Sequence, residues 1–221
     1  DEVYTAQFDS TLNFYDITFK NFDGSVIKVD NLGYGSTPEC ANPSREANAQ
    51  WTWTFSTWSP AIASVVGEAT YTAVYDSTLN HYNITFVSYD GSVVKTDNLA
   101  YGETPTCADQ VKPANVQWTY SFKGWNPTIV SVVGEATYTA VIDSVLNKYN
   151  ITFRNFDGTN LQSGLVEYGI LPTFNGNTPS KQATAQWTYN FKGWDKAIVT
   201  VAGDEVYTAQ FDSTLNFYDI T

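Results

Sequence analysis

The sequence predicts a mainly β protein in which one small four-stranded domain is repeated in tandem. Of the 221 residues, 16% are aromatic and 43% are hydrophobic, and 14 Gly and 8 Pro separate short apolar runs. Aromatic and β-branched residues favour strands, whereas Gly and Pro favour the turns between them, so this composition is typical of β-sheet domains. Several motifs also recur at one fixed interval, which is the pattern of tandem repeats.

The repeat has a period of about 67 residues. Three motifs define it: Tyr-Thr-Ala beginning at Tyr4, Tyr71, Tyr138 and Tyr207, Asp-Gly ending at Gly24, Gly91 and Gly158, and Gln-Trp-Thr centred on Trp51, Trp118 and Trp187. The third copy is longer by two residues, within a loop-like stretch rich in Pro, Asn and Ser. Residues 1–18 are identical to residues 204–221. This identity favours a parent array of near-identical three-domain blocks.

The second copy shows the expected elements most clearly, beginning with a hairpin. Residues 82–86 alternate apolar and polar side chains, which is the period of a half-buried strand. Asp90-Gly91 predicts a tight turn, because Gly accepts the positive φ that such a turn demands. A second strand then passes through Val94 and Leu99.

The rest of this copy is predicted in the following order: a loop or short helical turn over 103–116, a strand over 118–122, a bend at Gly124 that turns Trp125 toward the core, a last strand over 138–142, and a joint over 143–147. Pro105 and Pro113 exclude a central strand between the second and third strands. The joint contains neither Gly nor Pro, so we expect it to restrict bending between neighbouring domains.

The domain boundaries follow from these elements: 1–13 as the last strand of a preceding repeat, 14–80 as repeat 1, 81–147 as repeat 2, 148–216 as repeat 3, and 217–221 as the first strand of a following repeat. We expect each repeat to fold around its own buried tryptophan. Three such domains placed end to end would form an elongated rod on the order of 100 Å long.

The predicted structural residues fall into two groups. The structural core is expected to contain Trp51, Trp58, Trp118, Trp125, Trp187, Trp194, Tyr71 and Tyr138, and the turns are expected at Gly24, Gly91 and Gly158. Strand alternation places Trp51, Trp53 and Phe55 on one face, which favours core packing. The alternative is that such tryptophans stack on a sugar.

The order of motifs within a repeat resembles a known family. The motifs are Tyr-Asn-Ile-Thr-Phe at 82–86, Asp90-Gly91, Tyr-Gly-Glu-Thr-Pro at 101–105, Phe-Lys-Gly-Trp at 122–125 and Ala-Thr-Tyr-Thr-Ala at 136–140. They resemble the Listeria–Bacteroides repeat, also seen as the internalin B-type repeat. The resemblance implies a small β-grasp-like domain, strung in tandem in bacterial surface and secreted proteins as a stalk or an adhesive module. It carries no catalytic residues.

The residues that could carry chemistry do not recur as a catalytic or metal site would. His81 is the sole histidine, and Phe14 and Lys148 take its place in the other copies, which argues against a histidine triad or a zinc site. The turn carboxylates are Asp23, Asp90 and Asp157. Each stands almost alone in the sequence, whereas a calcium loop gathers several oxygen ligands. The sequence therefore predicts no enzyme activity, no catalytic residue, no cofactor and no metal.

The two cysteines, Cys40 and Cys107, occupy equivalent positions, and Phe174 replaces them in the third copy. An aromatic ring at that position predicts a semi-buried, apolar environment and therefore a buried free thiol. Equivalent points in successive domains lie too far apart for a disulfide. Cross-links between neighbouring fibres are the alternative. A Lys-to-Asn amide staple common to all copies is disfavoured, because no lysine position recurs in all three.

The net charge of −12 disfavours nucleic acid and anionic lipid as partners, because their phosphates would be repelled. No run of apolar residues is long enough to insert into a membrane. The expected partners are neighbouring repeats and other copies in a filament. The leading hypothesis is an extracellular stalk or fibre segment of a bacterial surface or secreted protein. The alternative is an adhesive module that binds a glycan or host surface protein through repeated aromatic patches.

Overall fold

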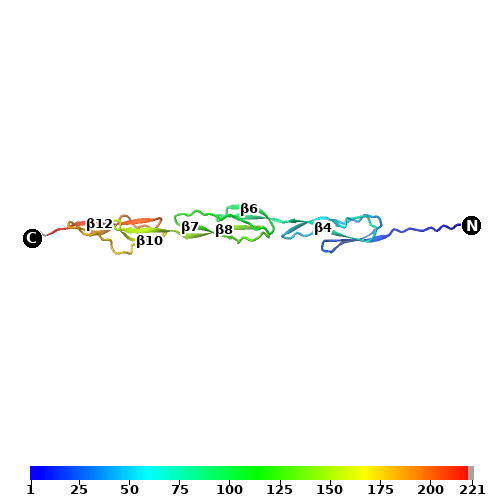
Figure 1. The fold of residues 1–221 in the computed structure, drawn as a ribbon, viewed down its shortest axis with the longest axis horizontal. Helices are drawn as coiled ribbons and strands as arrows, with labels where there is room; N and C mark the ends of the chain where they lie inside the picture. Colours follow the sequence, from blue (N-terminus) through cyan, green and yellow to red (C-terminus); the bar gives the residue numbers. More distant parts are fainter. Residues whose placement is uncertain (219–221) are drawn as a thin grey trace. The chain divides into compact units, whose positions relative to one another are not determined.

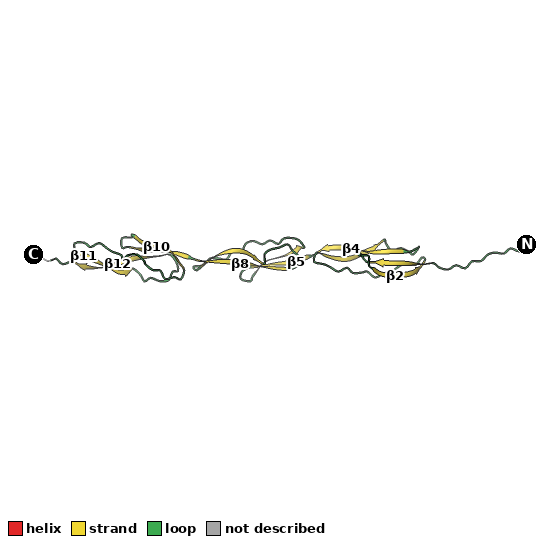
Figure 2. Cartoon of the chain, turned by 90° about the horizontal axis from the view of Figure 1, so that it is seen from below, coloured by secondary structure: helices red, strands yellow, loops and turns green. Residues whose placement is uncertain are grey.

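The computed structural model describes residues 1–218 and contains three four-stranded β-sheets. The strands are β1 (Phe14–Lys20), β2 (Val26–Gly33), β3 (Trp51–Ser59), β4 (Ala69–Leu79), β5 (His81–Val87), β6 (Val93–Ala100), β7 (Trp118–Asn126), β8 (Ala136–Leu146), β9 (Lys148–Arg154), β10 (Asn160–Glu167), β11 (Trp187–Trp194) and β12 (Glu205–Leu215). Figure 1 shows the strands in chain order by colour, and Figure 2 shows the described residues as strands joined by loops. The prediction of a mainly β protein is confirmed.

Contacts divide the chain into two compact units. The first unit contains residues 1–86, 93–107 and 129–138, and the second contains the remaining residues. The division runs through the second repeat, so the first and third sheets each lie within one unit. These two sheets therefore give the fullest account of the repeat.

Each sheet has the same strand order. In the first sheet it is β2-β1-β4-β3, and the other two are β6-β5-β8-β7 and β10-β9-β12-β11. The two outer pairs are antiparallel, whereas β1 and β4 lie parallel in the centre, and β9 and β12 repeat this arrangement. Because β2 and β3 are opposite edges, the chain between them must cross the sheet. The finer expectation of a β-grasp-like domain stays a prediction.

The core of each repeat is built around one phenylalanine of its first strand. Phe19 is fully buried, and its ring centroid lies 5.3 Å from that of Tyr71 and 4.9 Å from that of Trp58. In the third repeat Phe153 stacks on Tyr207 at 5.2 Å. Alternation along the strands places these rings on one face of the sheet. Aromatic pairs at such distances add to the free energy gained from burial alone.

The hairpin turns combine a glycine with an aspartate. Gly24, Gly91 and Gly158 have φ of 84°, 89° and 86°. Asp23 Oδ1 accepts hydrogen bonds from the Ser25 hydroxyl at 2.6 Å and the Ser25 backbone N–H at 2.9 Å. These bonds lower the pKa of Asp23, the hydroxyl bond having the larger effect. Both residues of the Asp-Gly motif are therefore used in forming the turn.

The prediction of a five-residue joint over 143–147 is wrong. Residues 143–146 pair with residues 118–121 of β7, so β8 continues to Leu146. Only Asn147 separates β8 from β9. Asp143 accordingly lies inside a strand, where Lys123 donates to it at 3.3 Å. The strand was underestimated because Asp143, Ser144 and Val145 are all exposed and show no alternation of apolar and polar side chains; their pairing with β7 makes them part of the strand.

The two ends of the chain show how far strand formation depends on partners. Residues 1–13 form no strand and are almost wholly exposed, although residues 2–12 have the same sequence as β12. Among the described residues, residues 1–13 have no partner strand. Within the predicted first strand at 217–221, residues 219–221 lie outside the described residues, and residues 217 and 218 are not in a strand.

One polar contact of the first repeat is incomplete in the third. The Tyr75 hydroxyl donates to Asn21 Oδ1 at 2.9 Å. Phe211 takes the place of Tyr75, and Asn155 Oδ1 is buried without a hydrogen-bond partner among the described residues. Phe211 packs against Phe156 at 5.7 Å, much as Tyr75 packs against the equivalent ring at 5.9 Å. The third repeat thus lacks the hydroxyl that, in the first repeat, donates to the equivalent oxygen.

Phe211→Tyr is expected to stabilise the third repeat by about 1 kcal/mol, because it supplies the missing donor to a buried acceptor. Hydrogen exchange of the β9–β12 amides in the whole chain measures the gain. The same substitution in an Asn155→Ala background should give no gain. An equal gain in both backgrounds would show that the hydroxyl does not act through Asn155.

Candidate functional site at the repeat joints

The joints at Asn80 and Asn147 are each a single asparagine that is hydrogen-bonded to both neighbouring repeats through its backbone. The Asn80 N–H donates to the Gln50 carbonyl of the first repeat at 2.9 Å, and the Asn80 carbonyl accepts from the Tyr101 N–H of the second repeat at 2.9 Å. The same pair of bonds links Asn147 to Gln117 and Tyr168, and Asn216 donates to Gln186. The backbone at the joint is thus held from both sides.

The asparagine side chain adds three further bonds. Asn80 Nδ2 donates to the carbonyls of Asn48 at 2.8 Å and Ala49 at 3.2 Å, and Asn80 Oδ1 accepts from the Thr52 hydroxyl at 2.8 Å. The equivalent atoms make the same contacts at Asn147, with Asn115, Val116 and Thr119, and at Asn216, with Thr184, Ala185 and Thr188. All the described joints therefore share one design.

A tyrosine from the following repeat reaches back across the joint. The Tyr82 hydroxyl donates to the Ala49 carbonyl at 2.6 Å, Tyr149 donates to Val116 at 2.6 Å, and Tyr218 donates to Ala185 at 2.6 Å. The carbonyl that receives this bond also receives the asparagine amide. One short loop thus binds the joint residue and the first strand of the next repeat.

Asparagine suits this position for a chemical reason. A short side chain that offers two N–H donors and an acceptor matches two loop carbonyls and a threonine hydroxyl. Aspartate would present acceptors to those carbonyls, and a longer glutamine would have to bend. The loop is itself fixed, because Asn48 Oδ1 accepts from the backbone N–H groups of Gln50 and Trp51 at 2.8 and 2.7 Å. The loop that binds the joint asparagine is therefore held by its own hydrogen bonds.

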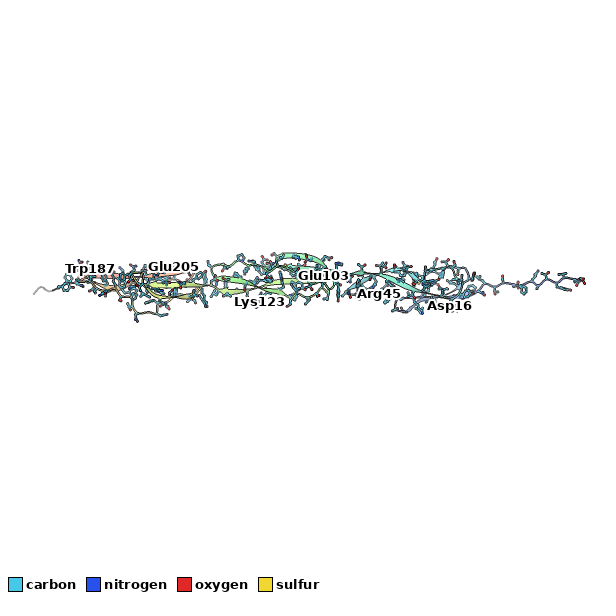
Figure 3. The ribbon with its side chains drawn as sticks, in the orientation of Figure 1. Asp16, Arg45, Glu103, Lys123, Trp187 and Glu205 are labelled. Atoms are coloured by element: carbon cyan, nitrogen blue, oxygen red, sulfur yellow. The ribbon has the colours of Figure 1, made fainter. Side chains whose placement is uncertain are left out.

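The predicted core residues lie either in or against the core of a repeat, or at the end of the sheet next to the joint. Trp58, Tyr71 and Tyr138 are buried. Trp125 and Trp194 are half-buried, and Trp194 packs against the core of the third repeat. The three remaining tryptophans are half-buried at the joint end of each sheet, where they pair in register with leucines: Trp51 with Leu79, Trp118 with Leu146 and Trp187 with Leu215. Trp187 is labelled in Figure 3.

A cation clamped between two aromatic rings recurs in each repeat, and the sequence reasoning missed it. The Arg45 guanidinium, labelled in Figure 3, lies 4.0 Å from the Phe22 ring centroid and 3.8 Å from that of Trp53. Lys112 sits over Tyr89 and Tyr120, and Lys181 sits over Phe156 and Tyr189. Each contact fastens the long crossing loop to the sheet. A basic residue at the same place in every loop was the available signal.

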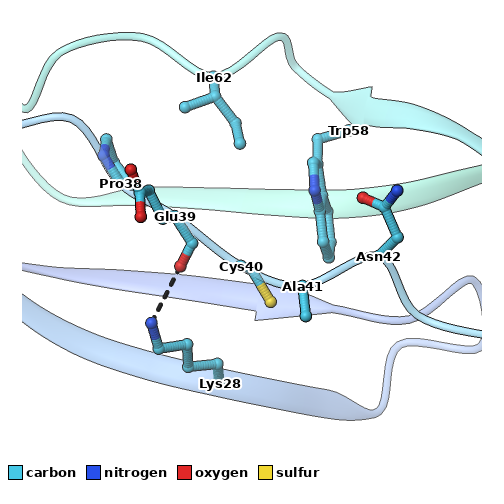
Figure 4. Close-up of a pocket in the computed structure, with 8 residues that line it drawn as sticks. All are labelled: Lys28, Pro38, Glu39, Cys40, Ala41, Asn42, Trp58 and Ile62. Atoms are coloured by element: carbon cyan, nitrogen blue, oxygen red, sulfur yellow. Dashed lines mark hydrogen bonds between the residues drawn. The ribbon is translucent and has the colours of Figure 1, made fainter.

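Cys40 is half-buried and lines a surface hollow of about 630 Å³. Figure 4 shows this hollow between Trp58 and the strand that carries Lys28, whose ammonium donates to the Glu39 carbonyl at 2.9 Å. Hydrogen bonding to Asp30 raises the pKa of Lys28, with desolvation opposing it. Cys40 and Cys107 are free thiols and half-buried, which fits the predicted semi-buried site, although the thiols are not buried as was expected.

Phe174 takes the position of Cys40 in the third repeat and fills it with an aromatic ring. The Phe174 ring centroid lies 5.3 Å from that of Phe153 and 5.0 Å from that of Trp194. Its space depends on Gly176, because a Cβ there would approach the Phe174 ring to 2.5 Å. The Phe174 ring therefore fits only when residue 176 has no side chain.

Gly176→Ala is expected to destabilise the third repeat by about 1–3 kcal/mol, because the added methyl overpacks against the Phe174 ring. In a Phe174→Cys background the same substitution should cost almost nothing. A double-mutant cycle, measured by hydrogen exchange on the whole chain, gives the coupling between the two positions. Equal costs in both backgrounds would contradict the contact.

Metal and membrane features were sought in residues 1–218. No group of three or more His, Cys, Asp or Glu side chains in this range could hold a metal ion. Over the same range no helix has the length and apolar character that a membrane crossing requires.

Comparison with known proteins gives a solved structure with weak similarity to this chain. Neither a protein-family model nor a curated protein matches the chain. A solved structure of Streptococcal High Identity Repeats in Tandem (SHIRT) domains 3-4 from a cell surface protein matches 60% of this chain and 99% of that chain, with 16% identity and a TM-score of 0.33. That protein is built from tandem repeats, but the likeness is too weak for a functional conclusion. The resemblance to the Listeria–Bacteroides repeat stays a prediction.

Proposed function

We propose that this chain is a structural stalk or fibre segment of a bacterial cell-surface or secreted tandem-repeat protein, and that it provides reach and continuity. The observation that carries the proposal is the asparagine joint, which recurs with the same partners between successive repeats. A one-residue joint whose backbone bonds to both neighbours and whose side chain bonds to the preceding repeat restricts bending far more than a flexible linker does. The function of such a stalk would depend on the distance that each repeat adds to its length.

The strand register indicates how far each repeat would extend such a stalk. Ile17 of β1 lies beside Ala69 of β4 in the parallel pair. A repeat would therefore advance from Phe14 to Ile17 and then from Ala69 to His81, which is about 15 residues of extended chain, or on the order of 50 Å. Three repeats aligned end to end would span about 150 Å, because the central strands are offset along their length.

Small-angle X-ray scattering of the whole chain tests the proposal. The expected radius of gyration is above about 40 Å for an aligned stalk, compared with about 17 Å for a compact domain of this length. Inserting Gly-Gly-Ser after Asn147 should broaden the distance distribution. The matched control is the same insertion after Asn177, in an exposed loop where added length is tolerated. A compact particle, or identical behaviour of the two insertions, would contradict the proposal.

The alternative is an adhesive module that binds a glycan or host protein through a repeated aromatic patch. One ring of each cation clamp is partly exposed: Phe22 at 46%, Tyr89 at 38% and Phe156 at 45%. These rings already contact a cation of their own loop. Intramolecular contact leaves less aromatic surface for a sugar, so we favour the stalk. Binding to a glycan array that is lost on Phe22→Ala would favour the alternative.

A further inference from the structure

The first two repeats each expose an edge strand with an apolar surface. β2 is hydrogen-bonded to β1 on one side only, and β6 holds the same position in the second sheet. Val26 is 58% exposed, Ile27 41% and Val29 55%. In β6, Val93 is 65% and Val94 41% exposed. An exposed edge with apolar side chains is a template for pairing with another strand.

The charges on these edges have a particular order. Lys28 and Asp30 lie two residues apart, hence on one face of β2, and their charged atoms are 2.6 Å apart. Lys95 and Asp97 repeat the arrangement in β6 at 2.7 Å. An edge lysine normally blocks pairing, because the partner strand would have to bury its charge. An aspartate two residues away allows pairing, provided that the aspartate of each strand lies opposite the lysine of the partner strand.

We propose that β2 and β6 are self-pairing edges, each of which binds the same strand of a second copy of this chain in an antiparallel arrangement. When two β2 strands pair about Val29, Lys28 of each copy lies opposite Asp30 of the other. When two β6 strands pair about Thr96, Lys95 lies opposite Asp97. Opposite charges placed directly across an antiparallel pair are stabilising, and like charges are destabilising.

This register is the one that the side chains favour. Pairing about Val29 places the exposed Val29 residues against each other and keeps the paired segment on the regular part of β2, after the bulge at Ile27. A one-residue slip would place Lys28 opposite Val29 and send every side chain to the other face. The interface is isologous, because the same strand contributes both sides. It would join chains side by side.

The third repeat lacks the pattern and acts as an internal control. Gln162 and Gly164 of β10 take the places of the lysine and the aspartate. A glycine within the strand also weakens it as a pairing partner. Self-pairing is therefore assigned to the first two repeats, whose edges share the Lys-x-Asp order.

Sedimentation velocity of the whole chain over a concentration series tests the proposal. We expect reversible association of the natural chain. Asp30→Lys with Asp97→Lys gives two Lys-x-Lys edges, and Lys28→Asp with Lys95→Asp gives two Asp-x-Asp edges. Each variant alone should associate at least tenfold more weakly. An equimolar mixture of the two should associate again, because lysines then face aspartates across the pair.

The matched control changes the same number of charges elsewhere. Asp143→Lys with Asp212→Lys alters exposed residues of the internal strands β8 and β12 and should leave association unchanged. Circular dichroism reports the folding of each variant. A natural chain that stays monomeric throughout, association that survives in either single-sign variant, or a mixture that fails to associate while both variants are folded would each overturn the proposal.

Discussion

Phe153→Ala is expected to lower the free energy of unfolding of the third repeat by about 3–5 kcal/mol, which is the usual cost of deleting a buried phenylalanine. The Phe153 ring is 1% exposed and contacts Trp194, Tyr207 and Phe174 at 4.8, 5.2 and 5.3 Å between centroids. Its removal would leave three large rings without their shared neighbour. Such a loss is a large part of the stability of a small domain.

Hydrogen exchange on the whole chain is the measurement, because a multidomain chain does not unfold in one two-state step. Loss of protection should be greatest in β9–β12 and small in β1–β4. Leu165→Ala is the matched control, since Leu165 is 69% exposed on the edge strand of the same sheet. If the control costs as much as Phe153→Ala, the core has been placed on the wrong face of the sheet.

Asn147→Asp should destabilise the joint between the second and third repeats by about 2 kcal/mol at neutral pH. The substitution keeps the shape of the side chain but removes the two N–H donors that bind the Asn115 and Val116 carbonyls. An introduced carboxylate beside carbonyl oxygens is disfavoured in its charged form, so its pKa should be raised in the folded chain. The joint should therefore recover stability as pH falls through that raised pKa, and lose it as pH rises.

Exchange of the Asn147 and Tyr168 amides reports the effect, because both N–H groups are bonded at the joint. Asn160→Asp introduces the same charge on the exposed strand β10 and serves as the control. Scattering from the Asn147→Asp chain should also show a broader distance distribution than scattering from the control. Equal exchange in the two variants would mean that the side-chain bonds of Asn147 contribute little.

The strands and turns could be predicted from the sequence where the pattern is local. The alternation over 82–86 and the Asp90-Gly91 turn each depend on a few neighbouring residues, and the structure has a strand and a turn there. The length of β8 could not be predicted in this way, because its last residues are held by pairing with β7. Residues 2–12 make the same point, since their sequence forms β12 only where partner strands are present.

The joint and the clamp could not be predicted from local pattern at all. The bonds of Asn80 connect it to residues 48–52, about thirty positions earlier in the chain. Arg45 likewise contacts Phe22 of the turn between β1 and β2 and Trp53 of β3, which are far apart in the sequence. The boundary at Asn80 was predicted from the order of the expected elements, but its partners depend on how the crossing loop folds back. Comparison of the three copies identifies equivalent positions without showing what they contact.

The parallel pair at the centre of the first and third sheets determines how such a repeat would respond to tension. In the first repeat the chain enters through β1 and leaves through β4, and these two strands lie side by side and point the same way. A force that pulls on the two ends of the repeat would slide β1 against β4 along their length. Their hydrogen bonds would then be sheared together, whereas a hairpin pulled from its open end unzips one bond at a time.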